Sequence, residues 1–111
     1  MIDIYLAIPY TNYSDHEREW IFETANRIAA KYILQGNTVI SPISHSHPIA
    51  KYDLIGKDFE SWRKFNFELL NLCRELYVVC IDGWKKSTGI KAEIEFAKEH
   101  DIPIKYLSGM I

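Results

Sequence analysis

The sequence has few cysteines, little net charge and no long apolar run, and each shortage excludes a class of protein. Its two cysteines, Cys73 and Cys80, are too few for a disulfide scaffold, and both stand in segments with the composition of buried core. With 13 basic and 15 acidic residues the formal net charge is −2, so no basic field is available to hold duplex nucleic acid. We therefore expect no nucleic-acid polymer as a partner.

The sequence also shows no pattern typical of a membrane-spanning helix or of a signal peptide. No stretch approaches the ~18 apolar residues that a membrane-spanning helix needs, and the first residues lack the basic and apolar regions of a signal peptide. We expect a cytoplasmic protein without a membrane partner. Since 111 residues suffice for one core and not for two, residues 1–111 are interpreted as a single domain.

Four short runs rich in β-branched and other apolar residues predict strands. They cover residues 2–8, 37–41, 76–81 and 102–107. The run at 76–81 is continuous rather than alternating, which is typical of a central strand covered on both faces.

Three segments between these runs carry apolar residues at helical spacing. The first begins after Ser14, which forms a capping-box pattern with Glu17, and ends near Gly36. The other two cover residues 59–73 and 88–100. Residues 42–58 show no clear period and are rich in Ser, His, Pro and Gly, so we expect an ordered loop there.

This alternation of strands and helices predicts an α/β fold, a three-layer sandwich with a small parallel sheet of four or five strands and helices on both faces. Open parallel sheets bind ligands at the carboxyl ends of their strands. That rule selects four segments as candidate ligand loops. They are residues 9–14, 41–48, 82–93 and the stretch after Leu107.

The segment 82–93 runs from a strand end through a glycine-containing turn into a helix, and it places Glu93 about one turn inside that helix. Free backbone N–H groups at a helix start attract anions, so this position suits a phosphate or a carboxylate. Two interpretations stay open. Glu93 either faces a ligand or simply complements the helix dipole, with Ser87 or Thr88 as the cap.

The other loops argue against cofactors. Pro9 and Tyr10 stand where a dinucleotide fingerprint has glycines, so NAD and FAD are not supported and no cofactor is expected. His45 and His47 form a His-x-His pair, but no third ligand stands at a recognisable spacing, so no metal is expected. We expect one of the two histidines to hydrogen-bond a substrate or to orient the loop.

Several motifs spread over nearly the whole chain resemble those of a family of unknown function labelled DUF1937 and, more widely, the nucleoside 2-deoxyribosyltransferase-like superfamily. The motifs are Tyr5-Leu6-Ala7-x-Pro9-Tyr10, the run from Ser41 to Pro48, Trp62 followed by Asn66, and Gly83-Trp84-x-x-Ser87-x-Gly89-x-x-x-Glu93. The resemblance implies a flavodoxin-like or Rossmann-like fold and a nucleoside or nucleotide ligand.

It also implies roles for individual residues. Glu93 would attack C1′ of the sugar, and Tyr5 or Tyr10 would contact the sugar or the nucleophile. Ser87 stands where related hydrolases contact a 5′-phosphate, which makes a nucleoside monophosphate a possible substrate. The substrate-binding residues implied along the motifs are Pro9, Tyr10, Ser41, His45, His47, Trp84, Ser87 and Gly89.

Asn66 departs from the pattern, because relatives usually carry an aspartate there that assists departure of the base or binds a sugar hydroxyl. An amide cannot protonate a leaving base. Asp53 or Asp58 could substitute for that aspartate, and the alternative is a module that binds or senses a nucleotide without turnover. A structural or interaction protein is a third possibility. Relatives commonly build each site from two subunits, so a homodimer or higher oligomer is expected.

Overall fold

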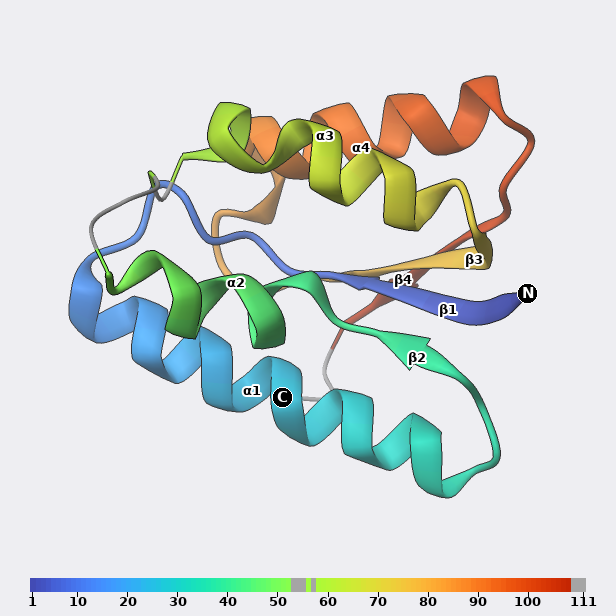
Figure 1. Cartoon of the computed structure of the whole chain (residues 1–111), viewed down its shortest axis with the longest axis horizontal. Coiled ribbons are helices and arrows are strands. Elements are labelled where there is room, and N and C mark those ends of the chain that lie inside the picture. Colours follow the sequence, from blue (N-terminus) through green and yellow to red (C-terminus); the bar gives the residue numbers. More distant parts are fainter. Residues whose placement is uncertain (53–55, 57, 109–111) are drawn as a thin grey trace.

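The computed structural model describes residues 1–52, 56 and 58–108. It is an α/β sandwich whose central sheet has four parallel strands in the order β2-β1-β3-β4 (Figure 1). The elements in chain order are β1 (Ile2–Ala7), α1 (Asp15–Leu34), β2 (Val39–Ile40), α2 (Pro42–Ala50), α3 (Phe59–Leu70), β3 (Cys73–Val79), a 3-10 turn η1 (Trp84–Lys86), α4 (Thr88–Glu99) and β4 (Ile104–Leu107). The predicted fold class, with a parallel sheet of four or five strands, is confirmed.

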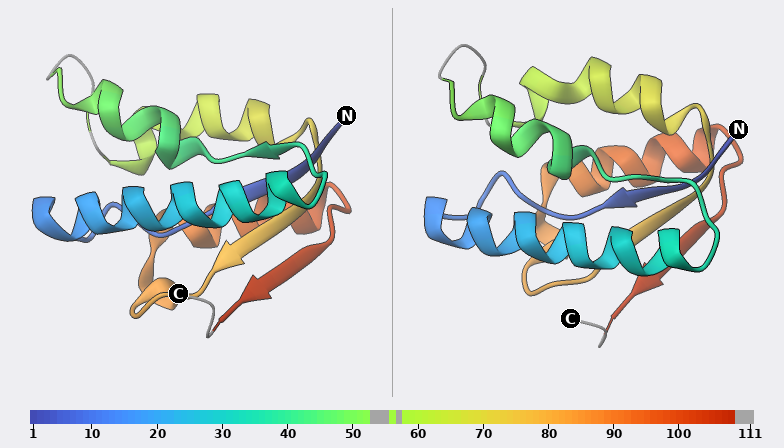
Figure 2. Two further views of the ribbon diagram at one scale, coloured as in Figure 1. Left: turned by 90° about the horizontal axis from the view of Figure 1, so that it is seen from below. Right: turned by 60° about the horizontal axis from the view of Figure 1, so that its bottom comes forward.

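The sheet is covered on both faces (Figures 1 and 2). Alternate side chains of β1 point to opposite faces, so Ile4 and Leu6 pack into a core with α1, while Tyr5 and Ala7 pack into a second core with α3 and α4. In the sheet, Tyr5 is paired with Leu76 of β3. This alternation puts Tyr5 on the same face as α4, which carries Glu93.

The predicted start and end of the first long helix are confirmed. Ser14 is the N-cap, its side chain accepts a hydrogen bond from the backbone N–H of Glu17, and the Glu17 carboxylate accepts one from the backbone N–H of Ser14. Gly36 follows the helix with a φ of 96°, a backbone conformation that favours glycine. The chain thereby reverses and enters β2.

The expectation of a loop over residues 42–58 is wrong for residues 42–50, because Pro42–Ala50 forms the helix α2, and residues 53–55 and 57 lie outside the described residues. Pro42 occupies the first turn, where its missing N–H costs nothing, and the buried Ser46, His47 and Ala50 give the helix an inner side. Packing against α1 stabilises it, and the Ser44 hydroxyl donates to Asn26 Oδ1 at 2.5 Å. Tertiary contacts therefore decide the structure of a segment whose composition favours a loop.

Other boundaries differ by a few residues from the expected ones. The second strand is only Val39–Ile40, the helix α3 ends at Leu70, and β3 already begins at Cys73. Cys73 is buried, and burial raises the pKa of its thiol to about 11. Within the described part of the chain, no helix combines the length and apolar character needed to cross a membrane.

Candidate functional site

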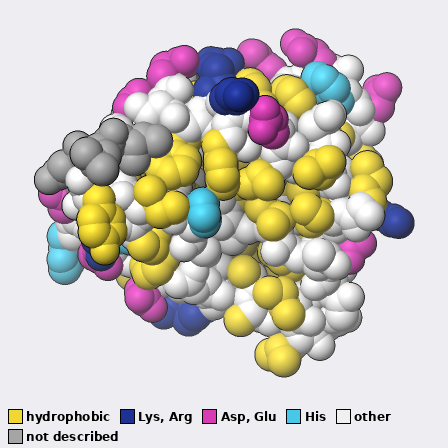
Figure 3. Space-filling view, viewed as in Figure 1, with side chains coloured by type: hydrophobic (Ala, Val, Ile, Leu, Met, Phe, Trp, Pro, Cys, Tyr) yellow, Lys and Arg dark blue, Asp and Glu magenta, His cyan; other side chains and the backbone are white. Residues whose placement is uncertain are grey.

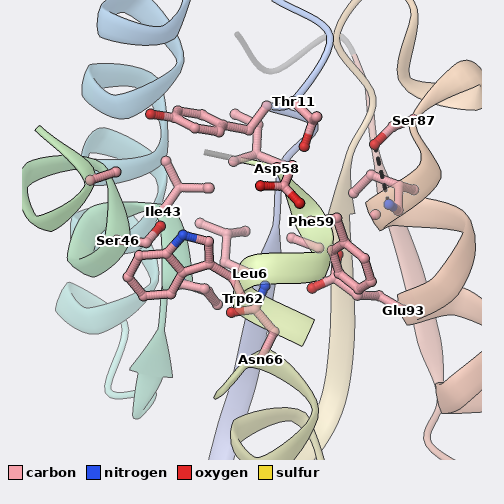
Figure 4. A pocket seen from close by; sticks show the side chains of 17 residues that line it. Leu6, Thr11, Ile43, Ser46, Asp58, Phe59, Trp62, Asn66, Ser87 and Glu93 are labelled. Carbon is pink, nitrogen blue, oxygen red and sulfur yellow. Dashed lines mark hydrogen bonds between the residues drawn. The ribbon is translucent and has the colours of Figure 1, made fainter. Parts of the chain in front are cut away.

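A pocket lies at the carboxyl ends of β1 and β3, between α2, α3 and α4 (Figure 4). It contains about 540 Å³ of empty space, part of which is open to solvent. The residues that line it are Leu6, Ala7, Ile8, Tyr10, Thr11, Pro42, Ile43, Ser46, Ala50, Asp58, Phe59, Trp62, Asn66, Ser87, Gly89, Ile90 and Glu93. Three of the four segments selected by the strand-end rule contribute to it, and residues 109–111 of the fourth lie outside the described residues.

Glu93 lines this pocket from α4, and its side chain is buried. Ser87 caps the helix, because its hydroxyl oxygen accepts a hydrogen bond from the Ile90 N–H at 3.2 Å. Of the two residues named as possible caps, Ser87 is therefore the N-cap, and Glu93 lies beyond the first turn of the helix. Its Oε2 accepts a short hydrogen bond from the hydroxyl of Tyr5, which reaches it from the central strand β1.

The protonation of Glu93 is set by two opposing effects. Burial raises the pKa of Glu93 to about 7, and the hydrogen bond from Tyr5 counteracts part of that rise by stabilising the carboxylate. Burial and the neighbouring Glu93 both raise the pKa of Tyr5 well above its usual value, so Tyr5 remains a donor. A carboxyl that titrates near neutral pH in a cleft is typical of a catalytic group.

Asn66 approaches the pocket from α3, close to its floor (Figure 4). Its side chain is only 8% exposed, and the buried Oδ1 has no hydrogen-bond partner among the described residues. An unpaired buried acceptor costs roughly 1–3 kcal/mol, which a ligand or water with a donor group would recover. Asn66 and Glu93 therefore line the same pocket, and Tyr5, which is not among the described lining residues, reaches Glu93 through its hydrogen bond. Nothing in the sequence spacing predicts that contact.

Asp58 also lines the pocket, and it immediately precedes the first residue of α3. Its Oδ1 accepts a hydrogen bond from the Ser61 hydroxyl at 2.7 Å, and this bond is the main reason why the pKa of Asp58 is lowered. The sequence suggested Asp58 only as a substitute for a missing aspartate. Asp53, the other suggestion, lies outside the described residues.

Phe59 and Trp62 form an aromatic wall that the sequence did not assign to the site. The Trp62 indole N–H donates to the carbonyl of Gly56 at 2.9 Å, which fixes the ring. Phe59 packs against the first turn of α4, where a Cβ added to Gly89 would lie 2.9 Å from Phe59 Cδ1. Gly89 therefore permits the close contact that joins α3 to α4 beside Glu93.

Tyr10 and His47 form a hydrogen-bonded chain at one side of the pocket. The Tyr10 hydroxyl lies 2.6 Å from His47 Nδ1, and His47 Nε2 lies 2.9 Å from Glu19 Oε1, which also pairs with Lys51 at 2.9 Å. The His47 ring is buried and stacks on Phe22. Because His47 does not line the pocket while Tyr10 does, His47 acts on the site by holding Tyr10.

Besides Tyr5 and His47, four predicted residues are not part of the lining that the described residues provide. His45 is exposed and stacks on Phe65, so it points away from His47. Ser41 precedes α2, Trp84 packs on Tyr106, and Pro9 is buried behind the pocket wall. No three His, Cys, Asp or Glu side chains gather as a metal site in residues 1–52, 56 and 58–108.

The α2 residues of the pocket, namely Pro42, Ile43, Ser46 and Ala50, were not assigned individually, although the strand-end rule had selected residues 41–48. The positions that α2 buries are three to four residues apart, which is helical spacing, but Ser46 and His47 are polar, so the apolar pattern of the sequence does not reveal the helix. Two prolines and two histidines in nine residues obscured it.

Comparison with known proteins identifies the family of the chain but assigns it no activity. No curated protein matches the sequence. A family model described as a domain of unknown function, DUF1937, matches residues 2–108, which include every described residue of the pocket. The chain therefore belongs to the DUF1937 family.

Proposed function

We propose that the protein cleaves or exchanges the N-glycosidic bond of a nucleoside or deoxynucleoside 5′-monophosphate, with Glu93 as the nucleophile. The observation that carries this proposal is the buried Glu93 carboxyl, which lines an open pocket and is held by Tyr5. The resemblance of the sequence motifs to the nucleoside 2-deoxyribosyltransferase-like superfamily supports the same chemistry.

In the proposed reaction one Glu93 oxygen attacks C1′ of the sugar while the bond from C1′ to the base nitrogen breaks and its electron pair leaves with the base. Tyr5 keeps its hydrogen bond to Oε2 and so holds the carboxylate in place. The glycosyl ester that forms is then opened by water or by a second base. A carboxylate suits this chemistry because positive charge develops on the sugar in the transition state.

Two features of the site fit these steps. Burial raises the pKa of Glu93 to about 7, so near neutral pH the carboxylate and the protonated form coexist, and the reactive carboxylate predominates above that pH. The aromatic side chains of Phe59 and Trp62 provide faces against which a base can pack. Asn66 cannot donate a proton as an acid, so the leaving base takes its proton from solvent.

The test is base release from a panel of deoxynucleosides and their 5′-monophosphates, followed by liquid chromatography. Glu93→Gln should abolish release, and the intact mass of the native protein should show a glycosyl adduct. Glu95→Gln is the matched control, because Glu95 is exposed on the same helix. Release that survives Glu93→Gln would remove Glu93 as the nucleophile.

A second candidate is a module that binds a nucleotide without turnover. Asn66 favours it, because the pocket then lacks the acid at the position where relatives have an aspartate. Saturable binding with no free base after long incubation would support this candidate over the first.

We also propose that the protein is a homodimer or higher oligomer. Large apolar side chains are exposed at Ile49, Tyr52 and Leu72, and apolar side chains gather on the face that carries α2 and α3 (Figure 3). Covering them would stabilise an assembly. Light scattering after size-exclusion chromatography measures the mass, and a monomer at all concentrations would contradict the proposal.

A further inference from the structure

The pocket carries negative charge without a compensating cation among its described lining residues. Asp58 and Glu93 are the charged side chains of that lining, which contains no Lys, Arg or His. A second cavity, which shares Tyr10 with the first, is lined by Arg18 and Lys51, and both of these cations have other partners. Arg18 donates to the carbonyls of Tyr10 and Thr11, and Lys51 pairs with Glu19.

Asp58 is held in the pocket by a tight turn. The Ser61 hydroxyl donates to Asp58 Oδ1, and a Cβ added to Gly56 would lie 2.4 Å from that oxygen. The Gly56 carbonyl is in turn fixed by the indole N–H of Trp62. Figure 4 shows the Asp58 carboxylate projecting into the pocket from the beginning of α3. Asp58 is exposed, whereas Asn66 and Glu93 are buried, so Asp58 stands nearer the solvent end.

The polar groups near the floor and mouth require donors from a ligand. Asn66 Oδ1 is a buried acceptor without a partner in the described chain, and the Asp58 carboxylate is an acceptor as well. Sugar hydroxyls and amino groups of a base are donors that match them. A phosphate presents acceptors and negative charge, so Asp58 would repel it, and the described lining offers it the N–H groups at the start of α4 but no cation.

We infer that Asp58 makes the pocket selective for an uncharged nucleoside over the corresponding 5′-monophosphate. The Asp58 carboxylate would accept hydrogen bonds from hydroxyl or amino groups of the nucleoside. This inference rests on the proposed function, which gives nucleosides and their 5′-monophosphates as ligands, and it narrows these ligands to the uncharged nucleosides.

The experiment measures dissociation constants by calorimetry for 2′-deoxyadenosine and thymidine and for their 5′-monophosphates. The variant Asp58→Asn removes the charge and keeps an acceptor for the Ser61 hydroxyl. Glu60→Gln is the matched control, because Glu60 is exposed on the same helix, pairs with Arg63 and does not line the pocket. Salt titration of the native protein gives a second measurement that does not depend on the variant.

The native protein should bind a nucleoside at least about tenfold more tightly than its monophosphate, and Asp58→Asn should reduce that preference by about tenfold. High salt should reduce it as well, and Glu60→Gln should leave it unchanged. Equal or tighter binding of the monophosphate by the native protein would overturn the inference, and so would an unchanged preference in Asp58→Asn. Base release, measured in the same samples, decides the proposed function separately: selective binding without release contradicts that function alone.

Discussion

Replacing Glu93 by glutamine should make the protein more stable at alkaline pH. In the folded protein, burial raises the pKa of Glu93 from the usual 4.5 to about 7. Since a tenfold change in proton affinity corresponds to about 1.4 kcal/mol, this rise amounts to about 3 kcal/mol. The folded state binds the Glu93 proton more tightly than the unfolded state does. The resulting contribution to the free energy of unfolding is fully present below pH 4.5 and is lost as the pH rises through about 7.

The assay is urea denaturation of the native protein and Glu93→Gln over a pH series from acidic to alkaline. The glutamine stays neutral and can still accept the hydrogen bond from Tyr5. The two free energies of unfolding should therefore nearly coincide at acidic pH, and the variant should exceed the native protein by up to about 3 kcal/mol at alkaline pH. Glu95→Gln, on the exposed side of the same helix, should follow the native curve.

The difference between the curves isolates Glu93, because all other titrating groups are common to both proteins. Parallel curves would mean that Glu93 has the same proton affinity folded and unfolded. A variant that is less stable than the native protein at alkaline pH would mean that the buried carboxylate is well solvated or paired, and the reasoning about the pocket would be refuted.

Three further predictions concern the same pocket. Tyr5→Phe removes the bond that lowers the pKa of Glu93, so the pH at which base release reaches half its maximum should move upward, as a profile of kcat/KM against pH would show. Gly89→Ala should cost about 1–3 kcal/mol in urea denaturation because its Cβ meets Phe59, and a gain in stability would contradict that contact. Asn66→Asp supplies an acid at the pocket floor and should increase base release on the acidic side of the profile, so an unchanged rate measured by chromatography would remove any role for an acid there.

The sequence was sufficient to predict the frame of the molecule. Alternating strand and helix patterns led to the parallel sheet, and the capping box at Ser14 fixed the start of α1. The strand-end rule placed residues 82–93 at the correct edge of the sheet. These features depend on local periodicity and on chain direction, both of which the sequence carries directly.

The finer arrangement of the site was beyond the sequence, because it depends on contacts between distant residues. Tyr5 and Glu93 are 88 positions apart, and their hydrogen bond follows from the packing of α4 on the sheet face that carries Tyr5. Asp58 lies next to Gly56 at the start of α3, and neither residue belongs to a periodic pattern. The helix α2 was missed because its packing on α1 outweighs its prolines.

Because all four strands are parallel, their amino ends lie together at one end of the sheet and their carboxyl ends at the other. The turns at Gly36 and Asp101, both with positive φ, precede β2 and β4 at the end where the strands begin. The pocket lies at the opposite end of the sheet. Fluorescent labels, affinity handles or fused domains attached at these turns would therefore leave ligand access undisturbed. Substitutions at the end where the strands begin would therefore change the stability of the fold without changing which ligand the pocket binds.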